Sequence, residues 1–239
     1  MILAERMKTY ESVSKTSLMI RTPVIVRVDG RAFHTYTKKF DKPKDFRIDD
    51  AMNATMLYLC KNIPGCILGY CQSDEISLVI TDYKILDTSP WFGYEVQKLV
   101  SIISSMATMA FNQRMMHLTG GTTCYGAMFD ARAFNVPAHE VENYLIWRQQ
   151  DCIRNVVSSY ARSKYSQKEV HGHNSDQLIL MLAKKGIIWT DLDSKIRNGR
   201  LAMKSADEGA CELKWNILED TPFFLEVRES IANLVNNPV

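Results

Sequence analysis

The sequence predicts an α+β fold in which the elements follow the ferredoxin-like order β-α-β-β-α-β. Three observations support it: short β-branched runs at 23–28 and 67–80, a helical segment at about 48–62, and an amphipathic stripe at 95–117 before a fourth strand. An antiparallel sheet of this kind carries its helices on one face and leaves the other face open. From residue 136 the pattern changes to helices and a small hairpin, so we expect domains at 1–135 and 136–239.

In the first half of the predicted domain, residues that start or end helices and strands set the element boundaries. A helix is expected at 3–10, and the first strand follows Pro23 and stops at Asp29. The polar, lysine-rich stretch 35–45 indicates a loop. The next helix is favoured by acidic residues in its first turn, where carboxylates suit the helix dipole, and Pro64–Gly65 ends it.

A hairpin and a long helix complete the predicted domain. Two apolar runs flank Ser73–Asp74–Glu75, which places Asp74 at the tip of the hairpin. After a loop at 83–90, one stripe of the long helix is apolar: Val96, Leu99, Val100, Ile103, Met106 and Met109. Gly120–Gly121 end this helix, and the fourth strand is predicted for 125–129, bounded by Asp130.

The C-terminal region is predicted to be mainly helical. A helix covers most of 137–165, with a break allowed near Trp147. Asn174 or Ser175 caps a second helix that runs through Lys184 and ends at Gly186. The remaining elements are a hairpin over 201–217 and, after Pro222, a last amphipathic helix that runs to about Val235.

Composition places the chain among ordinary globular proteins. Its 239 residues are 46% hydrophobic and 23% charged, and no apolar run is long enough to cross a membrane. The N-terminus carries charge too early for a signal peptide. The six cysteines include no C-x-x-C pair, which argues against a zinc site and against a secreted disulfide framework. We therefore expect buried, reduced cysteines in a cytoplasmic protein that does not engage membranes.

Charge says little about partners. The net charge is +2, whereas nucleic-acid binders usually carry a larger excess or a basic stripe. Basic residues do gather in two stretches, 38–47 and 154–168, which permits phosphate binding without requiring it.

The most informative pattern is that two short strands each end in an aspartate. If the first strand lies beside the hairpin, Asp29 and Asp74 meet at one edge of the sheet. Two carboxylates held close repel each other unless a cation lies between them, and such a pair suits magnesium and a nucleoside triphosphate. The alternative is that both aspartates only cap turns, which spacing by itself slightly favours.

Four motifs favour the metal site over simple turn capping. They are Arg27-Val-Asp-Gly-Arg-Ala-Phe-His34, Lys42-Pro-Lys-Asp45, Gln72-Ser-Asp-Glu-Ile-Ser77 and Tyr144-Leu-Ile-Trp-Arg-Gln-Gln-Asp-Cys152. In this order they resemble the tRNA-His guanylyltransferase superfamily. The resemblance implies a polymerase-like palm that uses two Mg²⁺ ions, with GTP, ATP or other NTPs as substrates. It also implies that nucleotides are added to the 5′ end of tRNA, in the 3′ to 5′ direction.

The resemblance also assigns residues. It makes Asp29 and Asp74 the metal carboxylates, with the carbonyl of Gly30 as a further ligand, and it gives Lys42 and Asp45 catalytic importance. The expected nucleotide contacts are Asp29, Gly30, Arg31, Ala32, Phe33, His34, Ser73, Asp74 and Lys98. The expected tRNA contacts are Arg148, Gln149, Arg154 and Asn155. Taken singly, Arg31 could simply be a surface ion-pair partner, and His34 is better explained as a satisfied histidine in a loop.

One departure from the pattern bears on the substrate. Where the eukaryotic enzymes continue with a histidine after Asp151–Cys152, this chain has Ile153, as in the guanylyltransferase-like proteins of bacteria, archaea and phages. That branch is associated with template-directed repair of 5′-truncated tRNAs, which we take as the expected function. The alternatives are addition of a single G to tRNA-His and a non-catalytic nucleotide- or RNA-binding palm. Relatives form tetramers, so a homotetramer built as a dimer of dimers is expected.

Overall fold

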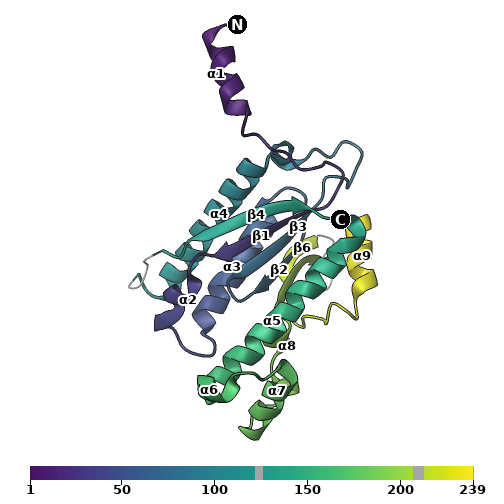
Figure 1. Cartoon of the computed structure of the whole chain (residues 1–239). Coiled ribbons are helices and arrows are strands. Elements are labelled where there is room, and N and C mark those ends of the chain that lie inside the picture. The colour runs from purple at the N-terminus through teal and green to yellow at the C-terminus, as the bar shows by residue number, and fades with distance from the viewer. Residues whose placement is uncertain (122–125, 207–212, 239) are drawn as a thin grey trace.

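The computed structural model describes residues 1–121, 126–206 and 213–238. The strands in these ranges form one antiparallel sheet with the order β4-β1-β3-β2-β5-β6 (Figure 1). They are β1 (Val24–Gly30), β2 (Cys66–Gln72), β3 (Glu75–Ile80), β4 (Phe129–Asn135), β5 (Arg200–Ala206) and β6 (Leu213–Ile217). The first four have the predicted ferredoxin-like arrangement. The predicted C-terminal hairpin is β5–β6, and it extends this same sheet by pairing with β2.

The helices in the described ranges differ widely in length. The long ones are α1 (Leu3–Ser12), α3 (Phe46–Asn62), α4 (Val96–Leu118), α5 (Val141–Lys164), α7 (Ser175–Lys184) and α9 (Arg228–Asn236). The short ones are α2 (Phe33–Tyr36), α6 (Gln167–Val170) and α8 (Ser194–Arg197), together with 3₁₀ turns at Thr37–Lys39, Trp91–Tyr94, Ala138–Glu140 and Trp189–Asp191. Helix α1 projects from the body, and α6 and α7 lie at the far end of α5 (Figure 1).

Helices α3 and α4 cover one face of the sheet, as predicted. Met56, Leu59, Leu99 and Phe111 from these helices are fully buried against alternate residues of the strands, such as Leu78. Burial of this apolar surface is the main force that holds the two helices on the sheet.

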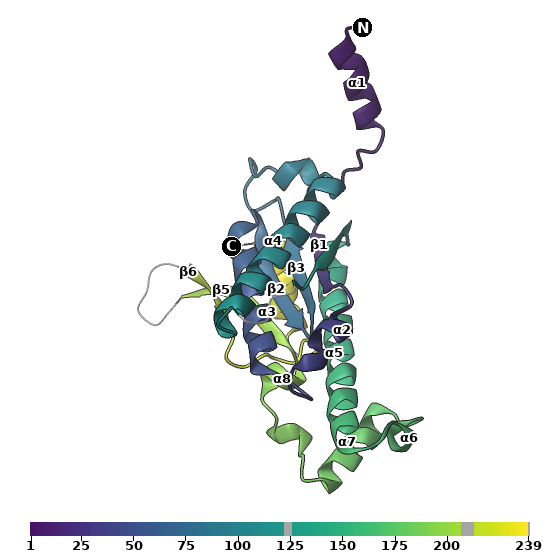
Figure 2. The same ribbon diagram turned by 90° about the vertical axis from the view of Figure 1, so that its left-hand side faces the viewer.

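The sequence pattern predicted that the opposite face of the sheet is open, and this prediction is wrong. The C-terminal segment folds back over that face and covers it. Val141 and Leu145 of α5 and Ile231 of α9 join Ile25 and Val79 in a second buried cluster. Figures 1 and 2 show α5 running along this face of the sheet. Helix α5 continues through Trp147 without a break.

The fourth strand lies later in the chain than predicted. The prediction of 125–129 is wrong, because β4 starts at Phe129 and residues 126–128 precede it; Tyr125 lies outside the described residues. Along β4, Ala131 and Ala133 pack on the α3–α4 side, while Asp130 and Arg132 are exposed. Such half-polar alternation is typical of an edge strand and escapes a search for a continuous apolar run.

Other local predictions are confirmed. Asn174 caps α7, with its side chain accepting a hydrogen bond from the backbone N–H of Gln177. The four cysteines in the described part of the chain, Cys60, Cys66, Cys71 and Cys152, are buried and free. Cys124, Cys211 and the predicted tip of the β5–β6 hairpin lie outside it. No helix in the described ranges is long and apolar enough to span a membrane.

Candidate active site

The structure brings the two aspartates together. Strand β1 pairs with β3, so Asp29 lies opposite Glu75, the residue that follows Asp74. The backbone N–H of Gly30 donates to the carbonyl oxygen of Asp74 at 3.1 Å, which ties the end of β1 to the hairpin tip. At the tip, Ser73 adopts a positive φ of 47° and its hydroxyl donates to the Asp74 carboxylate at 2.7 Å.

Gly30 leaves room for the Asp74 carboxylate. A Cβ atom at Gly30 would lie 2.9 Å from Asp74 Oδ2 and 2.4 Å from a ring carbon of Phe33, so no other residue fits without displacing both. Burial raises the pKa of Asp74, the Asp29 charge raises it further, and the hydrogen bond from Ser73 opposes both effects. A cation between the carboxylates would relieve this cost.

The residues therefore fit a metal that takes oxygen ligands. No group of three or more His, Cys, Asp or Glu side chains is placed to hold a metal among the described residues. Asp29 and Asp74 would supply the side-chain oxygens, and further ligands would come from backbone carbonyls, water or substrate. Magnesium commonly binds in this way, through one or two carboxylates and substrate phosphates.

The chain after Gly30 forms a tight turn beside this pair. Ala32 has a positive φ of 50° and begins the single helical turn of α2. Phe33 is buried against Phe111 and Phe129, which anchors the turn, while Arg31 and His34 are exposed. Both side chains thus remain accessible to a ligand.

A pocket of about 380 Å³ opens next to Asp74. Of the predicted site residues, it is lined by Phe33, His34, Lys42, Asp45, Ser73, Asp74 and Asn155. Its other charged residues are Asp41, Lys44, Asp49, Lys195 and Arg200. The pocket thus combines cationic side chains with one edge of the carboxylate pair, an arrangement suited to a nucleotide with its phosphates near a metal.

Asp45 organises the loop that forms one wall of this pocket. It caps α3, and its buried carboxylate accepts hydrogen bonds from the guanidinium of Arg47 at 2.6 and 2.9 Å and from the N–H of Asp41 at 3.0 Å. The Arg47 hydrogen bond lowers the pKa of Asp45 to about 2. Lys42 is exposed and donates to Thr37 at a long 3.4 Å. A catalytic part for Asp45 and Lys42 stays a prediction.

Sequence reasoning missed Arg200, the most buried cation of the pocket. It is 3% exposed and donates to Asp49 and to the Cys71 sulfur, each at 3.1 Å. Its Nε has no hydrogen-bond partner in the described part of the chain. Asp49 also pairs with Lys44 at 2.9 Å. No local signal marks Arg200 in the sequence, because it only opens an apolar strand; the pairing of β5 with β2 places it at the site.

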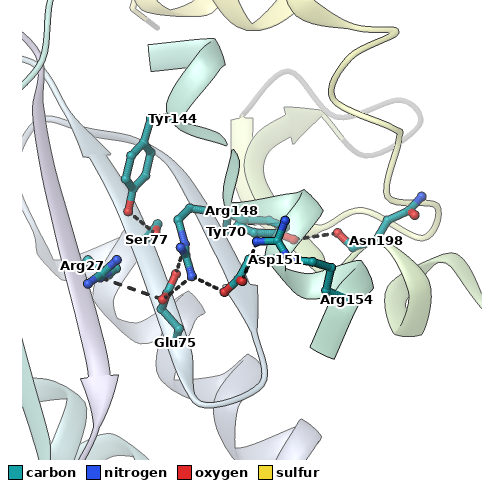
Figure 3. Close-up of polar contacts among 9 residues, drawn as sticks. All are labelled: Arg27, Tyr70, Glu75, Ser77, Tyr144, Arg148, Asp151, Arg154 and Asn198. Atoms are coloured by element: carbon teal, nitrogen blue, oxygen red, sulfur yellow. Dashed lines mark hydrogen bonds and ion pairs between the residues drawn. The ribbon is translucent and has the colours of Figure 1, made fainter. Parts of the chain in front are cut away.

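Arg148 and Gln149, predicted to contact tRNA, lie inside the protein. Arg148 forms a two-pronged ion pair with Glu75 at 2.8 and 2.9 Å and also bonds Asp151 (Figure 3). Gln149 is 1% exposed and bonds backbone groups of Asn198, Pro222 and Phe224. These contacts fasten α5 to the hairpin tip and to the C-terminal segment, and tRNA contact by either residue stays a prediction.

The remaining predicted residues are scattered. Arg154 is exposed and bonds Asp151 at 2.9 Å, and Asn155 is exposed at the pocket rim. Lys98 is exposed on the first turn of α4, where it pairs with Glu95 at 3.5 Å, and it does not line the pocket. A nucleotide contact by Lys98 is therefore not supported by this arrangement and stays a prediction.

A polymerase-like palm sheet, an aspartate pair and a cationic pocket define the class of nucleotidyltransferases. The family model of tRNA(His) guanylyltransferase matches residues 4–137, more than half of the chain, and the chain belongs to this family. It is therefore a nucleotidyltransferase that acts on the 5′ end of tRNA.

Relatives match well beyond that range. An uncharacterized protein of Acanthamoeba polyphaga mimivirus is 32% identical over 80% of this chain and 73% of its own length. A probable tRNA(His) guanylyltransferase of Dictyostelium discoideum is 31% identical over 76% and 75%. A bacterial tRNA(His) guanylyltransferase-like protein solved with ATP is 38% identical, with a TM-score of 0.91 over 98% of this chain and 99% of that one. The likeness to this structure includes the C-terminal helices.

Proposed function

We propose that the protein is a Mg²⁺-dependent 3′–5′ nucleotidyltransferase that rebuilds truncated 5′ ends of tRNA by template-directed addition. The observation that carries the proposal is the convergence of Asp29, Gly30 and Asp74 beside the cationic pocket. The bacterial guanylyltransferase-like protein has been solved with ATP and with GTP, which supports nucleotides as the ligands of the equivalent pocket here.

The proposed roles differ between the aspartate pair and the side chains that line the pocket. Asp29 and Asp74 would hold Mg²⁺, which supplies charge neutralisation for the triphosphate and lowers the pKa of an attacking hydroxyl when bound. Lys42, Lys44 and His34 line the pocket; the two lysines offer cationic donors to phosphates, and His34 offers an imidazole N–H. The Glu75–Arg148 ion pair fixes the start of β3, directly after Asp74. The Asp74 carboxylate is therefore held in position before substrate binds.

The choice of repair over addition of a single G to tRNA-His is supported by the surroundings of Ile153. Its side chain packs into an apolar cluster formed by Val157, Ala161 and Leu178 between α5 and α7. An isoleucine at this position builds the protein interior and offers no hydrogen bond to an anticodon. The eukaryotic pattern has a histidine here, and its replacement by isoleucine supports repair over selective recognition of tRNA-His.

The test uses purified protein, each NTP, intact tRNA-His and several tRNAs that lack their first nucleotide. We expect the missing nucleotide to be restored according to the opposite strand in tRNAs of any identity. Asp29→Ala and Asp74→Ala should each reduce addition by about 10²–10³-fold, the usual loss of one electrostatic group of about 3–4 kcal/mol. Dominant single-G addition to tRNA-His would establish the alternative function, and near-normal rates in both variants would exclude these aspartates as metal ligands.

A further inference from the structure

A second hollow, of about 200 Å³, lies at the C-terminal end of α5, where the chain turns through α6 toward α7. Its polar lining comes from Ser158 and Arg162 on α5, Gln167 on α6, and His171 and His173 in the following turn. None of the described residues that line it is acidic. The hollow therefore presents hydrogen-bond donors without a competing carboxylate.

The acid nearest in sequence is already engaged. Glu169 accepts hydrogen bonds from the backbone N–H of Ser166 at 2.8 Å and from its hydroxyl at 2.7 Å. These bonds lower the pKa of Glu169 and keep its carboxylate at the start of α6. Its charge thus belongs to a capping box and does not line the hollow.

The walls of the hollow are held in place without a ligand. Leu178 of α7 packs against Val157 and Ala161 of α5 beneath it. The Tyr165 hydroxyl donates to the carbonyl of Met181 at 2.7 Å, which fixes α7 against the end of α5. Gly172, at a φ of +81°, provides the turn between the two histidines. A preformed site loses less entropy on binding than a flexible one.

We propose that this hollow binds a phosphate of the tRNA backbone and thereby sets where the RNA lies relative to the active pocket. An arginine, two imidazoles, an amide and a hydroxyl match the oxygens of a phosphodiester. The proposal rests on the proposed function, because it needs RNA to be the substrate.

The position on α5 favours RNA over a free nucleotide. Neighbouring residues of this helix serve the two cavities: Ser159 and Asn155 line the active pocket, while Ser158 and Arg162 line the hollow. From 155 to 162 the helix rises by about 10 Å, at 1.5 Å per residue. One RNA molecule could occupy both sites at once, because its backbone carries many successive phosphates.

The experiment measures binding of full-length protein to tRNA lacking its first nucleotide, without NTP, over a range of salt concentrations. The variants are Arg162→Gln and the double change His171→Gln with His173→Gln; Lys61→Gln, an exposed charge at the end of α3, is the matched control. For Arg162→Gln we expect about tenfold weaker binding and a shallower dependence of log K on log salt, by about 0.7–0.9 for one lost phosphate contact. Arg162→Lys should restore the salt dependence, and thermal melting of each variant checks its folding.

The outcomes separate the two proposals. Unchanged affinity and salt dependence in both site variants, or losses equal to those of Lys61→Gln, would overturn the phosphate site. A raised KM for ATP with unchanged RNA binding would also overturn it and assign the hollow to a free nucleotide. Loss of RNA binding in a protein whose wild type extends no tRNA would uphold the hollow and reject the repair activity.

Discussion

The two faces of strand β3 are both buried, yet they differ in chemistry. Residues Ile76, Leu78 and Ile80 point to the α3–α4 side, where they lie in the large apolar cluster. On the other side, Glu75 pairs with Arg148 and Ser77 bonds the Tyr144 hydroxyl at 2.8 Å (Figure 3). Val79, further along the same side, lies in an apolar cluster with Leu145. Polarity on this side therefore increases step by step toward the hairpin tip and Asp74.

The two sides of β3 are therefore expected to have different roles, one in the stability of the fold and the other in the position of Asp74. An apolar face tolerates small shifts, because dispersion and hydrophobic contacts are not directional. A two-pronged ion pair and a buried hydrogen bond fix direction, since misaligned partners leave unsatisfied groups in the interior. We therefore expect the α3–α4 face to govern folding and the α5 face to govern the geometry of Asp74.

The largest effect on stability alone is expected from the apolar face. Leu99→Ala removes a fully buried side chain and leaves a cavity, which should lower the free energy of unfolding by about 3–4 kcal/mol. Activity per folded molecule should be unchanged, because Leu99 lies in the first turn of α4, about 18 Å along the helix from Phe111, which contacts the turn after Gly30. Urea unfolding with steady-state kinetics below the transition checks this, and a matching loss of kcat in fully folded protein would contradict it.

Breaking the polar face should cost somewhat less stability and much more activity. Arg148→Met leaves Glu75 buried without its main partner, which should destabilise the fold by about 3 kcal/mol. The penalty is limited because Arg27 lies 3.8 Å from the same carboxylate. The kcat should fall as Asp74 loses its support, while the KM for ATP changes little. Adding Glu75→Gln should recover part of the stability, and a double-mutant cycle that gives no coupling would refute the pairing.

The stability of the same variant should depend on pH more strongly than that of the wild type. Burial raises the pKa of Glu75 in the folded protein, and Arg148 at present opposes that rise. Without Arg148 the folded-state pKa rises further above the unfolded value, so the proton is bound more tightly in the folded state. Arg148→Met should therefore lose stability relative to wild type as pH rises from 4.5, the ordinary value, through the raised pKa. Unfolding in metal-free buffer between pH 4 and pH 8 measures the difference.

The smallest effect is expected in the middle of the polar face. Tyr144→Phe removes one buried hydrogen bond to Ser77 and leaves that hydroxyl without this partner, at a cost of about 1–2 kcal/mol. Adding Ser77→Ala to the same chain should recover some of this loss. Equal destabilisation by Tyr144→Phe in the presence and absence of Ser77 would show that the bond contributes nothing.

Prediction from sequence succeeded where the signal is local. The run Val24–Val28 ending at Asp29, and the hairpin tip at Asp74, follow from β-propensity and turn chemistry, and the structure brings the two ends together. The shift of the fourth strand to Phe129–Asn135 had no such signal, because an edge strand with one polar face has a weak apolar pattern. Arg200 was likewise invisible, since its place depends on a pairing between segments 129 residues apart.

The sequence by itself determined the element order, the aspartates that end two strands and the motifs that indicate the family, because propensity, capping and turn formation act over a few residues. Only the tertiary structure decided that α5 covers the second face, that Arg148 and Gln149 are buried, and that Arg200 of β5 lines the pocket. Those outcomes depend on which apolar surfaces meet and which buried charges find partners, and both are properties of the packed chain.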